Sequence, residues 1–168
     1  MKICVVGGWK PEKIDKYRPQ AESLGYELAK RDHTLVSAPS SGIQAVVAEA
    51  YKNNGGKEFI GYYPALYQMR ENVMVEPDVP VYTQEDYPVR NLFMVRQSDA
   101  LFAITGGSRT VSELNAAMRD YRLPTAFYAG SNHKVDGYRK LGEKFAENLI
   151  YGNDIVELLD KIESFHNL

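Results

Sequence analysis

The chain has 168 residues, of which 44% are hydrophobic and 25% are charged, and its formal net charge at pH 7 is −2. This size and composition are typical of a single globular domain over residues 1–168. No apolar run reaches the roughly 18 residues that a membrane-spanning helix needs, and the basic residues are scattered, so neither a membrane nor a nucleic acid is expected as a partner.

The first half of the sequence alternates apolar strand segments with amphipathic helical segments. Residues 2–6 form a continuous apolar run, typical of a strand that helices cover on both faces, and Gly7-Gly8 allows a tight turn after it. Residues 64–88 have weak periodicity, which predicts a long loop with at most a short strand near 79–82. Between these segments the pattern predicts a helix over 19–31, a strand over 34–36, a helix over 43–51 and a strand over 59–63.

The second half repeats this alternation. Pro88 suits the first turn of a helix, and that helix is predicted to carry Arg90. Asn153 or Asp154 is the predicted N-cap of the last helix. The remaining predicted elements are a strand over 101–104, a helix over 111–121, a strand over 124–128, a mostly polar helix over 134–148, a short strand over 149–151 and a helix over 155–162.

Strands that alternate with helices through short, glycine-bearing connections predict an α/β fold. The expected architecture is a Rossmann-like, doubly wound parallel sheet with helices on both faces, in one domain. Ligands bind such sheets at the carboxyl ends of the strands, so any site is expected at that edge.

Three of the predicted strand-to-helix turns consist largely of small residues: Gly7-Gly8, residues 40–42 with Gly42, and residues 106–108. Free backbone N–H groups and the positive end of the helix dipole meet at such turns, where they stabilise a phosphate. The alternative is that tight turns in parallel α/β folds need small residues whether or not they bind anything. Neither the dinucleotide fingerprint nor the Walker lysine motif is present.

The third turn carries two further candidates. Thr110 and Glu113 have the spacing of a capping box, in which both side chains only close the helix start. Arg90, taken alone, is equally typical of a solvated position on a helix. None of these three residues by itself indicates a site.

Cysteine and histidine patterns give no sign of a disulfide or of a metal site. The single Cys4 lies within an apolar strand, where a buried small hydrophobic residue explains it better than a nucleophile does. The three histidines are far apart and lack metal-ligand spacing, so no metal and no other cofactor is expected. The apolar run at the N-terminus is too short for a signal peptide, which favours a cytoplasmic location.

The segment 90–113 resembles the LOG family, the cytokinin-activating nucleoside 5′-monophosphate phosphoribohydrolases. The hallmark of that family is an Arg-Lys pair upstream of Pro-Gly-Gly-x-Gly-Thr-x-x-Glu. Residues 106–107, Thr110 and Glu113 match this motif, and Arg90 matches the family's catalytic arginine. The chain is therefore similar to a divergent member of the family. The departures are Asn91 for the lysine, Thr105 for the proline, Arg109 for the third glycine and Ser112 for a usual first glutamate.

The resemblance implies a nucleotide-binding domain that hydrolyses the N-glycosidic bond of a nucleoside 5′-monophosphate to a free base and ribose 5-phosphate. Glu113 would stabilise the oxocarbenium-like transition state and position the attacking water, while Arg90 would orient that carboxylate or bind the ribose and base. The residues expected to hold the phosphorylated ligand are Gly106, Gly107, Ser108, Arg109 and Thr110, with Gly7, Gly8 and Gly42 in the neighbouring turns.

The departures leave a second interpretation open, a nucleotide-binding or sensing protein of the same superfamily that performs no catalysis. Arg109 could fill the space that a glycine leaves for the ligand, or it could place its guanidinium on the phosphate. Arg90 and Glu113 favour chemistry, whereas Arg109 and the altered loop 37–41 favour the binding protein. The tyrosine-rich segment 62–87 suits a subunit interface, so a homodimer is the expected assembly.

Overall fold

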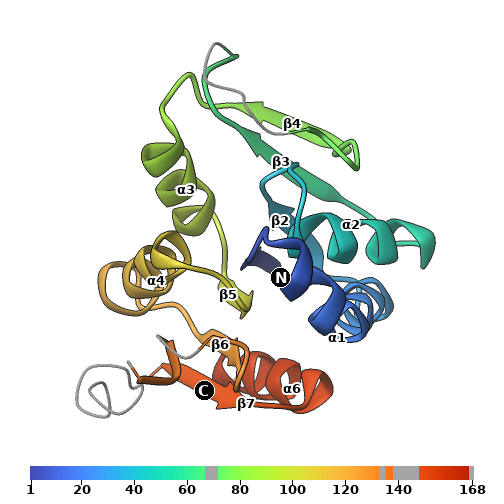
Figure 1. The fold of residues 1–168 in the computed structure, drawn as a ribbon, viewed down its shortest axis with the longest axis vertical. Helices are drawn as coiled ribbons and strands as arrows, with labels where there is room; N and C mark the ends of the chain where they lie inside the picture. The colour runs from blue at the N-terminus through green and yellow to red at the C-terminus, as the bar shows by residue number, and fades with distance from the viewer. Residues whose placement is uncertain (67–71, 133–134, 138–147, 167–168) are drawn as a thin grey trace.

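The computed structural model of the protein describes residues 1–66, 72–132, 135–137 and 148–166. Its centre is a seven-stranded sheet with the order β4-β3-β2-β1-β5-β6-β7, in which every pairing is parallel (Figure 1). The predicted doubly wound parallel sheet is confirmed. The strands are β1 (Lys2–Gly7), β2 (Thr34–Ser37), β3 (Phe59–Tyr63), β4 (Val79–Tyr82), β5 (Ala100–Ile104), β6 (Thr125–Tyr128) and β7 (Leu149–Gly152).

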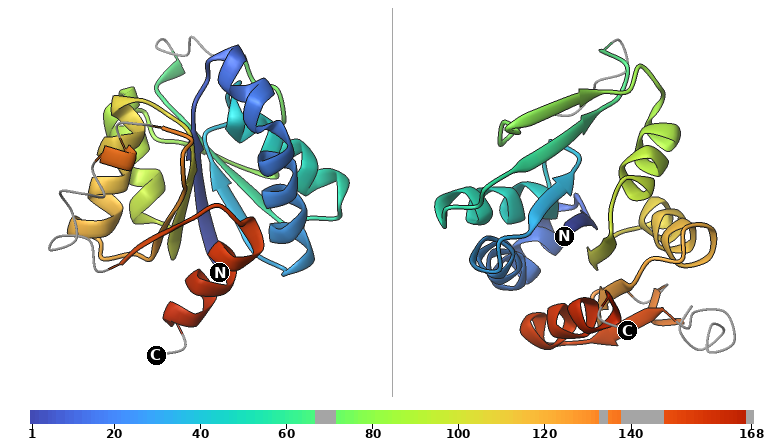
Figure 2. Two further views of the ribbon diagram at one scale, coloured as in Figure 1. Left: turned by 60° about the horizontal axis from the view of Figure 1, so that its bottom comes forward. Right: turned by 180° about the vertical axis from the view of Figure 1, so that it is seen from behind.

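Helices cover both faces of the sheet. Helices α1, α2 and α6 pack on one face, and α3 and α4 pack on the other (Figure 2). None of the helices in the described ranges combines the length and the apolar character that crossing a bilayer requires. The helices are α1 (Pro11–Lys30), α2 (Ile43–Asn53), α3 (Tyr87–Arg96), α4 (Ser108–Asn115), a π-helical turn η2 (Ala116–Asp120) that continues α4, and α6 (Ile155–His166).

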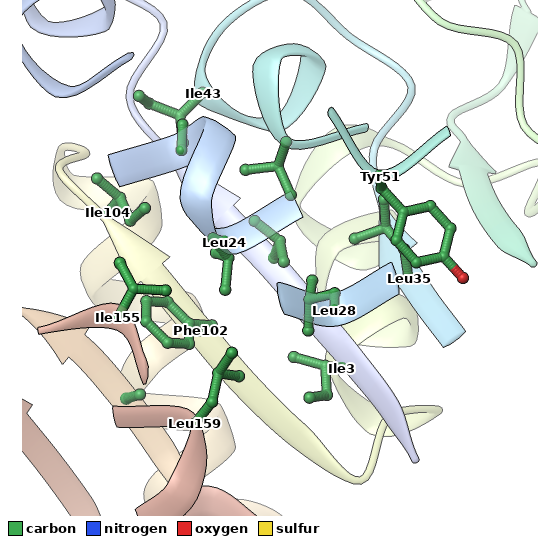
Figure 3. Packing of buried hydrophobic residues seen from close by; sticks show 14 of the residues in the cluster. Ile3, Leu24, Leu28, Leu35, Ile43, Tyr51, Phe102, Ile104, Ile155 and Leu159 are labelled. Atoms are coloured by element: carbon green, nitrogen blue, oxygen red, sulfur yellow. The ribbon is translucent and has the colours of Figure 1, made fainter. Parts of the chain in front are cut away.

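The core has two halves because side chains alternate along each strand. Ile3 and Val5 of β1 contact the first half, under α1, α2 and α6, whereas Cys4 and Val6 contact the second half, under α3 and α4. Figure 3 shows the first half, where Leu24 of α1 meets strand and helix residues that are far away in the sequence. Central strands such as β1 and β5 are buried on both faces, which is why their sequences are uninterrupted apolar runs.

Several predicted boundaries differ from the structure. Helix α1 begins at Pro11, eight residues before the predicted start, and it carries Pro19 in its interior at the cost of one hydrogen bond. Tyr17 anchors the early turns, because its ring is buried and its hydroxyl donates to the Gly130 carbonyl at 2.9 Å. The short strand predicted near 79–82 is confirmed as β4, at one edge of the sheet. Most of the helix predicted over 134–148 lies outside the described residues.

Two helix starts agree with the sequence. The Asp154 side chain accepts a hydrogen bond from the Glu157 N–H at 2.9 Å, so Asp154 is the N-cap of α6. Asp86 caps α3 in the same way, through the Val89 N–H at 3.0 Å. Pro88 lies in the first turn of α3, as predicted.

Candidate functional site

A pocket of about 540 Å³ opens at the carboxyl ends of β1, β2 and β5, with α3 and α4 on its other side. The sheet order runs outward from β1 in one direction and from β5 in the other, so this edge holds the switch point where ligands bind open α/β sheets. We call this cavity the main pocket. The predicted site residues that line it are Gly7, Arg90, Gly107, Ser108, Arg109, Thr110 and Glu113.

The turn between β5 and α4 has an unusual backbone. Thr105 and Gly106 have φ angles of 57° and 120°, and a left-handed conformation is uncommon for a β-branched residue. Neighbouring groups hold this turn: the Thr105 N–H donates to the Ser131 hydroxyl at 2.8 Å, and the Asn132 amide donates to the Gly106 carbonyl. A Cβ on Gly106 would lie 2.2 Å from the Thr110 hydroxyl, so only glycine fits here.

Because of this turn, helix α4 begins at the main pocket, and no side chain caps its first backbone N–H groups. The helix begins at Ser108, its N-cap is Gly107, and neither a capping side chain nor an acidic residue is present in its first turn. The alternative interpretation of Thr110 and Glu113 as a capping box is therefore wrong, because Thr110 is already the third helical residue. The first N–H groups of an α-helix have no acceptor within the helix. Together with the helix dipole they favour an anion at this position.

Glu113 lies deeper in the same pocket. Its side chain is buried, with 7% of the residue exposed, and it is the sixth residue of α4. Five residues of helix rise separate it from Ser108 by about 7.5 Å along the axis. An anion at the start of α4 and the carboxylate of Glu113 are therefore held apart, which reduces their mutual repulsion.

Arg90 of α3 lines the same pocket as Glu113, and hydrogen bonds to the protein hold its side chain in place. Only 4% of the residue is exposed, its Nη1 donates to the Tyr62 carbonyl at 2.7 Å, and its Nε donates to the Asn91 side chain at 2.8 Å. The interpretation of Arg90 as a solvated helix residue is therefore wrong. Arginine keeps its charge at all ordinary pH values, so the pocket contains a permanent cation.

Both charged groups also act on Cys4, which lies in β1 beneath the pocket. Burial raises the pKa of the Cys4 thiol well above its ordinary value, and the charge of Glu113 raises that pKa further. A hydrogen bond with the Ser98 side chain and the charge of Arg90 act in the opposite direction. Cys4 therefore stays a protonated, buried thiol, consistent with the packing role that the sequence predicts.

Arg109 does not plug the pocket. Its side chain is exposed at the rim, with the guanidinium carbon 5.8 Å from the centre of the Tyr87 ring, and the guanidinium of Arg90 lies 5.2 Å from the same ring. The 540 Å³ of the main pocket remain open with Arg109 in this place. The long side chain can reach a phosphate at the start of α4 from there.

The remaining predicted glycines lie around the main pocket rather than in it. Gly8 and Gly106 line a smaller neighbouring cavity of about 230 Å³, which we call the side pocket. Gly42 lines neither cavity. Its φ is 116°, and a Cβ there would lie 2.8 Å from the Gly8 carbonyl, so Gly42 lets the start of α2 pack against the connection that follows β1.

Several lining residues were not predicted. Trp9, 72% exposed, lines both pockets, and Asn72 reaches the main pocket from the long connection between β3 and β4. A tryptophan directly after the Gly7-Gly8 turn, at the carboxyl end of a predicted strand, is the signal in the sequence that could have identified Trp9. Ser40 and Ser41, from the second of the three predicted turns, and Asn91, next to Arg90 in the motif, also line the main pocket. The other unpredicted residues of this pocket are Ala38, Gln44 and Met94.

Comparisons with known proteins agree with this architecture. The rice (Oryza sativa subsp. japonica) protein named "probable cytokinin riboside 5′-monophosphate phosphoribohydrolase LOGL6" is 37% identical over 114 residues, which are 67% of this chain and 45% of that protein. The Arabidopsis thaliana cytokinin riboside 5′-monophosphate phosphoribohydrolase LOG7 is 34% identical over 143 residues, 82% of this chain and 63% of that protein. The chain spans about half the length of the first curated relatives that it matches.

The fold is also that of a solved structure, the Moco carrier protein from Chlamydomonas reinhardtii. The TM-score is 0.80 at 19% identity, over 99% of this chain and 98% of that one. The model of the SLOG cluster4 family matches residues 1–153. Taken together with the identity to the LOG enzymes, this match confirms the predicted resemblance, and the chain belongs to the SLOG cluster4 family as a divergent, LOG-type member.

Proposed function

We propose that this protein hydrolyses the N-glycosidic bond of a nucleoside 5′-monophosphate, consuming one water and releasing the free base and ribose 5-phosphate. One observation carries the proposal. A single pocket combines an uncapped helix start, which suits a phosphate, with a buried carboxylate and a buried guanidinium. The names of the curated relatives, phosphoribohydrolases of a riboside 5′-monophosphate, support the same activity.

The phosphate end of the ligand is assigned to the start of α4. Ser108, Arg109 and Thr110 line this end of the main pocket, and we assign their N–H groups, the Thr110 hydroxyl and the Arg109 guanidinium to the phosphate. No described atom lies within 4 Å of a Cβ placed on Gly107, so the backbone there is open to a ligand. Binding energy from this remote phosphate orients the bond that reacts.

The sugar end is assigned to Glu113 and Arg90. As the glycosidic bond breaks, positive charge develops at C1′ of the ribose, and the Glu113 carboxylate stabilises it at short range inside a buried site. The same carboxylate accepts a proton from the attacking water. Arg90, held by the Tyr62 carbonyl, keeps the carboxylate oriented or binds the ribose hydroxyls.

A second candidate is a nucleotide-binding protein without catalysis. It is favoured by the four motif departures, at Asn91, Thr105, Arg109 and Ser112. The Chlamydomonas protein of the same fold is named a carrier protein, so proteins named for binding also have this fold. Arg109 is the residue whose change should discriminate most between the two candidates, because it stands at the rim where the ligand enters.

The test is incubation with a panel of nucleoside 5′-monophosphates, with the released base and ribose 5-phosphate quantified by chromatography. The proposal predicts that at least one monophosphate is cleaved, and that unphosphorylated nucleosides bind more weakly. Arg109→Gly, which restores the family's glycine, should still cleave the substrate, with a changed KM. If no monophosphate is cleaved while one of them raises the melting temperature, the binding protein is the correct function.

We further propose that residues 1–168 act as one domain in the cytoplasm and as a homodimer, with a small molecule rather than a nucleic acid as ligand. Exposed apolar side chains on α3 and β4, among them Leu92, Phe93 and Tyr82, support self-association beside the main pocket. Light scattering coupled to size exclusion measures the assembly, and a monomer at micromolar concentration would contradict it.

A further inference from the structure

The side pocket is built from three segments that also frame the main pocket. Lys10 and Lys13 come from the start of α1, Thr105 and Gly106 from the turn after β5, and Ser131 and Asn132 from the segment after β6. Trp9 and Gly107 line both cavities. The two pockets are therefore neighbours that meet at the start of α4.

The charge of the side pocket is positive and not neutralised. None of the described residues that line it is acidic, and two of them are lysines. Across the described ranges, neither Lys10 nor Lys13 forms an ion pair. The lysines that do are Lys30, Lys52, Lys57 and Lys161. Two ammonium groups at the mouth of a small cavity attract an anion more strongly than isolated surface lysines do.

The walls of the side pocket are fixed before any ligand arrives. The Ser131 hydroxyl donates to the Tyr128 carbonyl at 2.6 Å and accepts the Thr105 N–H, and Asn132 donates to the Gly106 carbonyl. Ser131 and Asn132 are buried, so these bonds are shielded from water. Lys10 is also the N-cap of the 20-residue helix α1, and no side chain caps that helix start. The α1 dipole adds to the positive potential, and Glu12, the acidic residue of the first turn of α1, offsets only part of the charge of the two lysines.

We propose that the side pocket binds a second phosphate, carried by the same ligand, so that nucleoside 5′-diphosphates are bound more tightly than monophosphates. The proposal rests on the proposed function for the position of the first phosphate, at Gly107 and Ser108. A group attached to that phosphate reaches the side pocket past Gly107, where the backbone is open. Lys10 and Lys13 then contact the second phosphate.

The test compares the dissociation constants of AMP and ADP. Trp9, the only tryptophan of the chain, lines both pockets, so its fluorescence reports on either site, and calorimetry gives an independent value. We expect ADP to bind the parent protein about tenfold more tightly than AMP. The reason is that hydrogen bonds to a charged group, here the second phosphate, are stronger than those between neutral groups. Equal affinities for the two nucleotides in the parent would overturn the proposal.

Variants of the lysines test whether the side pocket causes the difference in affinity between AMP and ADP. The double variant Lys10→Gln/Lys13→Gln should bring the ratio of AMP to ADP dissociation constants close to one. The control is Lys16→Gln, which removes one positive charge from the same part of α1 but lies outside both pockets, with its ammonium 5.3 Å from the Tyr17 ring centre. The control should keep the ratio of the parent. A ratio that survives in the double variant would overturn the proposal.

Inorganic pyrophosphate separates this proposal from the proposed function, because it carries two phosphates and no sugar. Pyrophosphate binding that is lost in the double variant and kept in Lys16→Gln supports the side pocket even if no monophosphate is cleaved. Cleavage of AMP without any gain for ADP overturns the side pocket and leaves the proposed function standing.

Discussion

Replacing Gly107 with alanine should separate ligand binding from stability. A Cβ at this position meets no described atom within 4 Å, and the φ of −130° is one that alanine adopts without strain. The added methyl would project into the open space next to the α4 amides. The fold should therefore keep its stability while the phosphate loses its close approach to the backbone.

The size of this effect follows from the hydrogen bonds that the methyl displaces. Hydrogen bonds to a charged phosphate are worth about 1.5–3 kcal/mol each, so losing two of them weakens monophosphate binding by about a hundredfold or more. Calorimetric titration of Gly107→Ala with AMP measures this loss. Thermal denaturation without ligand should give a melting temperature close to that of the parent.

Gly106→Ala is the matched control, because it adds the same methyl one residue earlier. Here the φ is 120° and the Cβ would lie 2.2 Å from the Thr110 hydroxyl. Left-handed strain of about 1–2 kcal/mol and overpacking of about 1–3 kcal/mol add to about 2–5 kcal/mol, or a melting point lower by roughly 5–15 °C. The reasoning is refuted if Gly107→Ala is destabilised as much as Gly106→Ala, or if it binds AMP as well as the parent does.

Two further predictions concern stability at the opposite edge of the sheet, where Arg31 joins α1 to α6. Arg31→Met should lower the free energy of unfolding, measured in urea, by about 1–3 kcal/mol. The Arg31 side chain is 17% exposed, and its guanidinium forms ion pairs with Glu27, Asp160 and Glu163 at 2.7–3.1 Å. An unchanged midpoint of urea unfolding would contradict this prediction. Burial lowers the pKa of His33, and its bond to Glu163 only partly offsets this. The unfolded chain therefore binds the His33 proton more readily, so stability should fall as the pH drops below about 6.5, the ordinary histidine pKa. His33→Gln should show a shallower loss in urea titrations between pH 7 and 5, and an equally steep loss would count against this assignment.

The central part of the sheet was predictable because strands such as β1, β3 and β5 are buried and form continuous apolar runs. The start of α1 was not predictable, for two reasons. Residues 11–18 contain only Ile14 and Tyr17 as large apolar residues, and Pro19 is a residue typical of a first helical turn. Tertiary contacts of Tyr17 decide the outcome there. Local periodicity carries no information about such contacts.

The site residues that belong to one sequence motif were predictable, whereas those that only the folded chain brings to the pocket were not. Arg90 and Glu113 follow from the motif, but the spacing of Thr110 and Glu113 fits a capping box equally well, and only the observed helix start at Ser108 decides between the two. The position of Trp9 after a glycine turn is a weak local signal, whereas Asn72 comes from a connection that carries no local signal for a common cavity. Long-range packing of the β1–α1 and β3–β4 connections brings them together.

The central claim is that the Glu113 carboxylate performs chemistry on a nucleotide whose phosphate lies at the start of α4. The most direct measurement is the single-turnover rate of base release by Glu113→Gln, with Glu157→Gln, an exposed carboxylate of α6, as the control. We predict a rate at least about a hundredfold below that of the parent, the usual loss for a general base, with monophosphate binding retained. Release of the base at the parent's rate by Glu113→Gln would contradict the account.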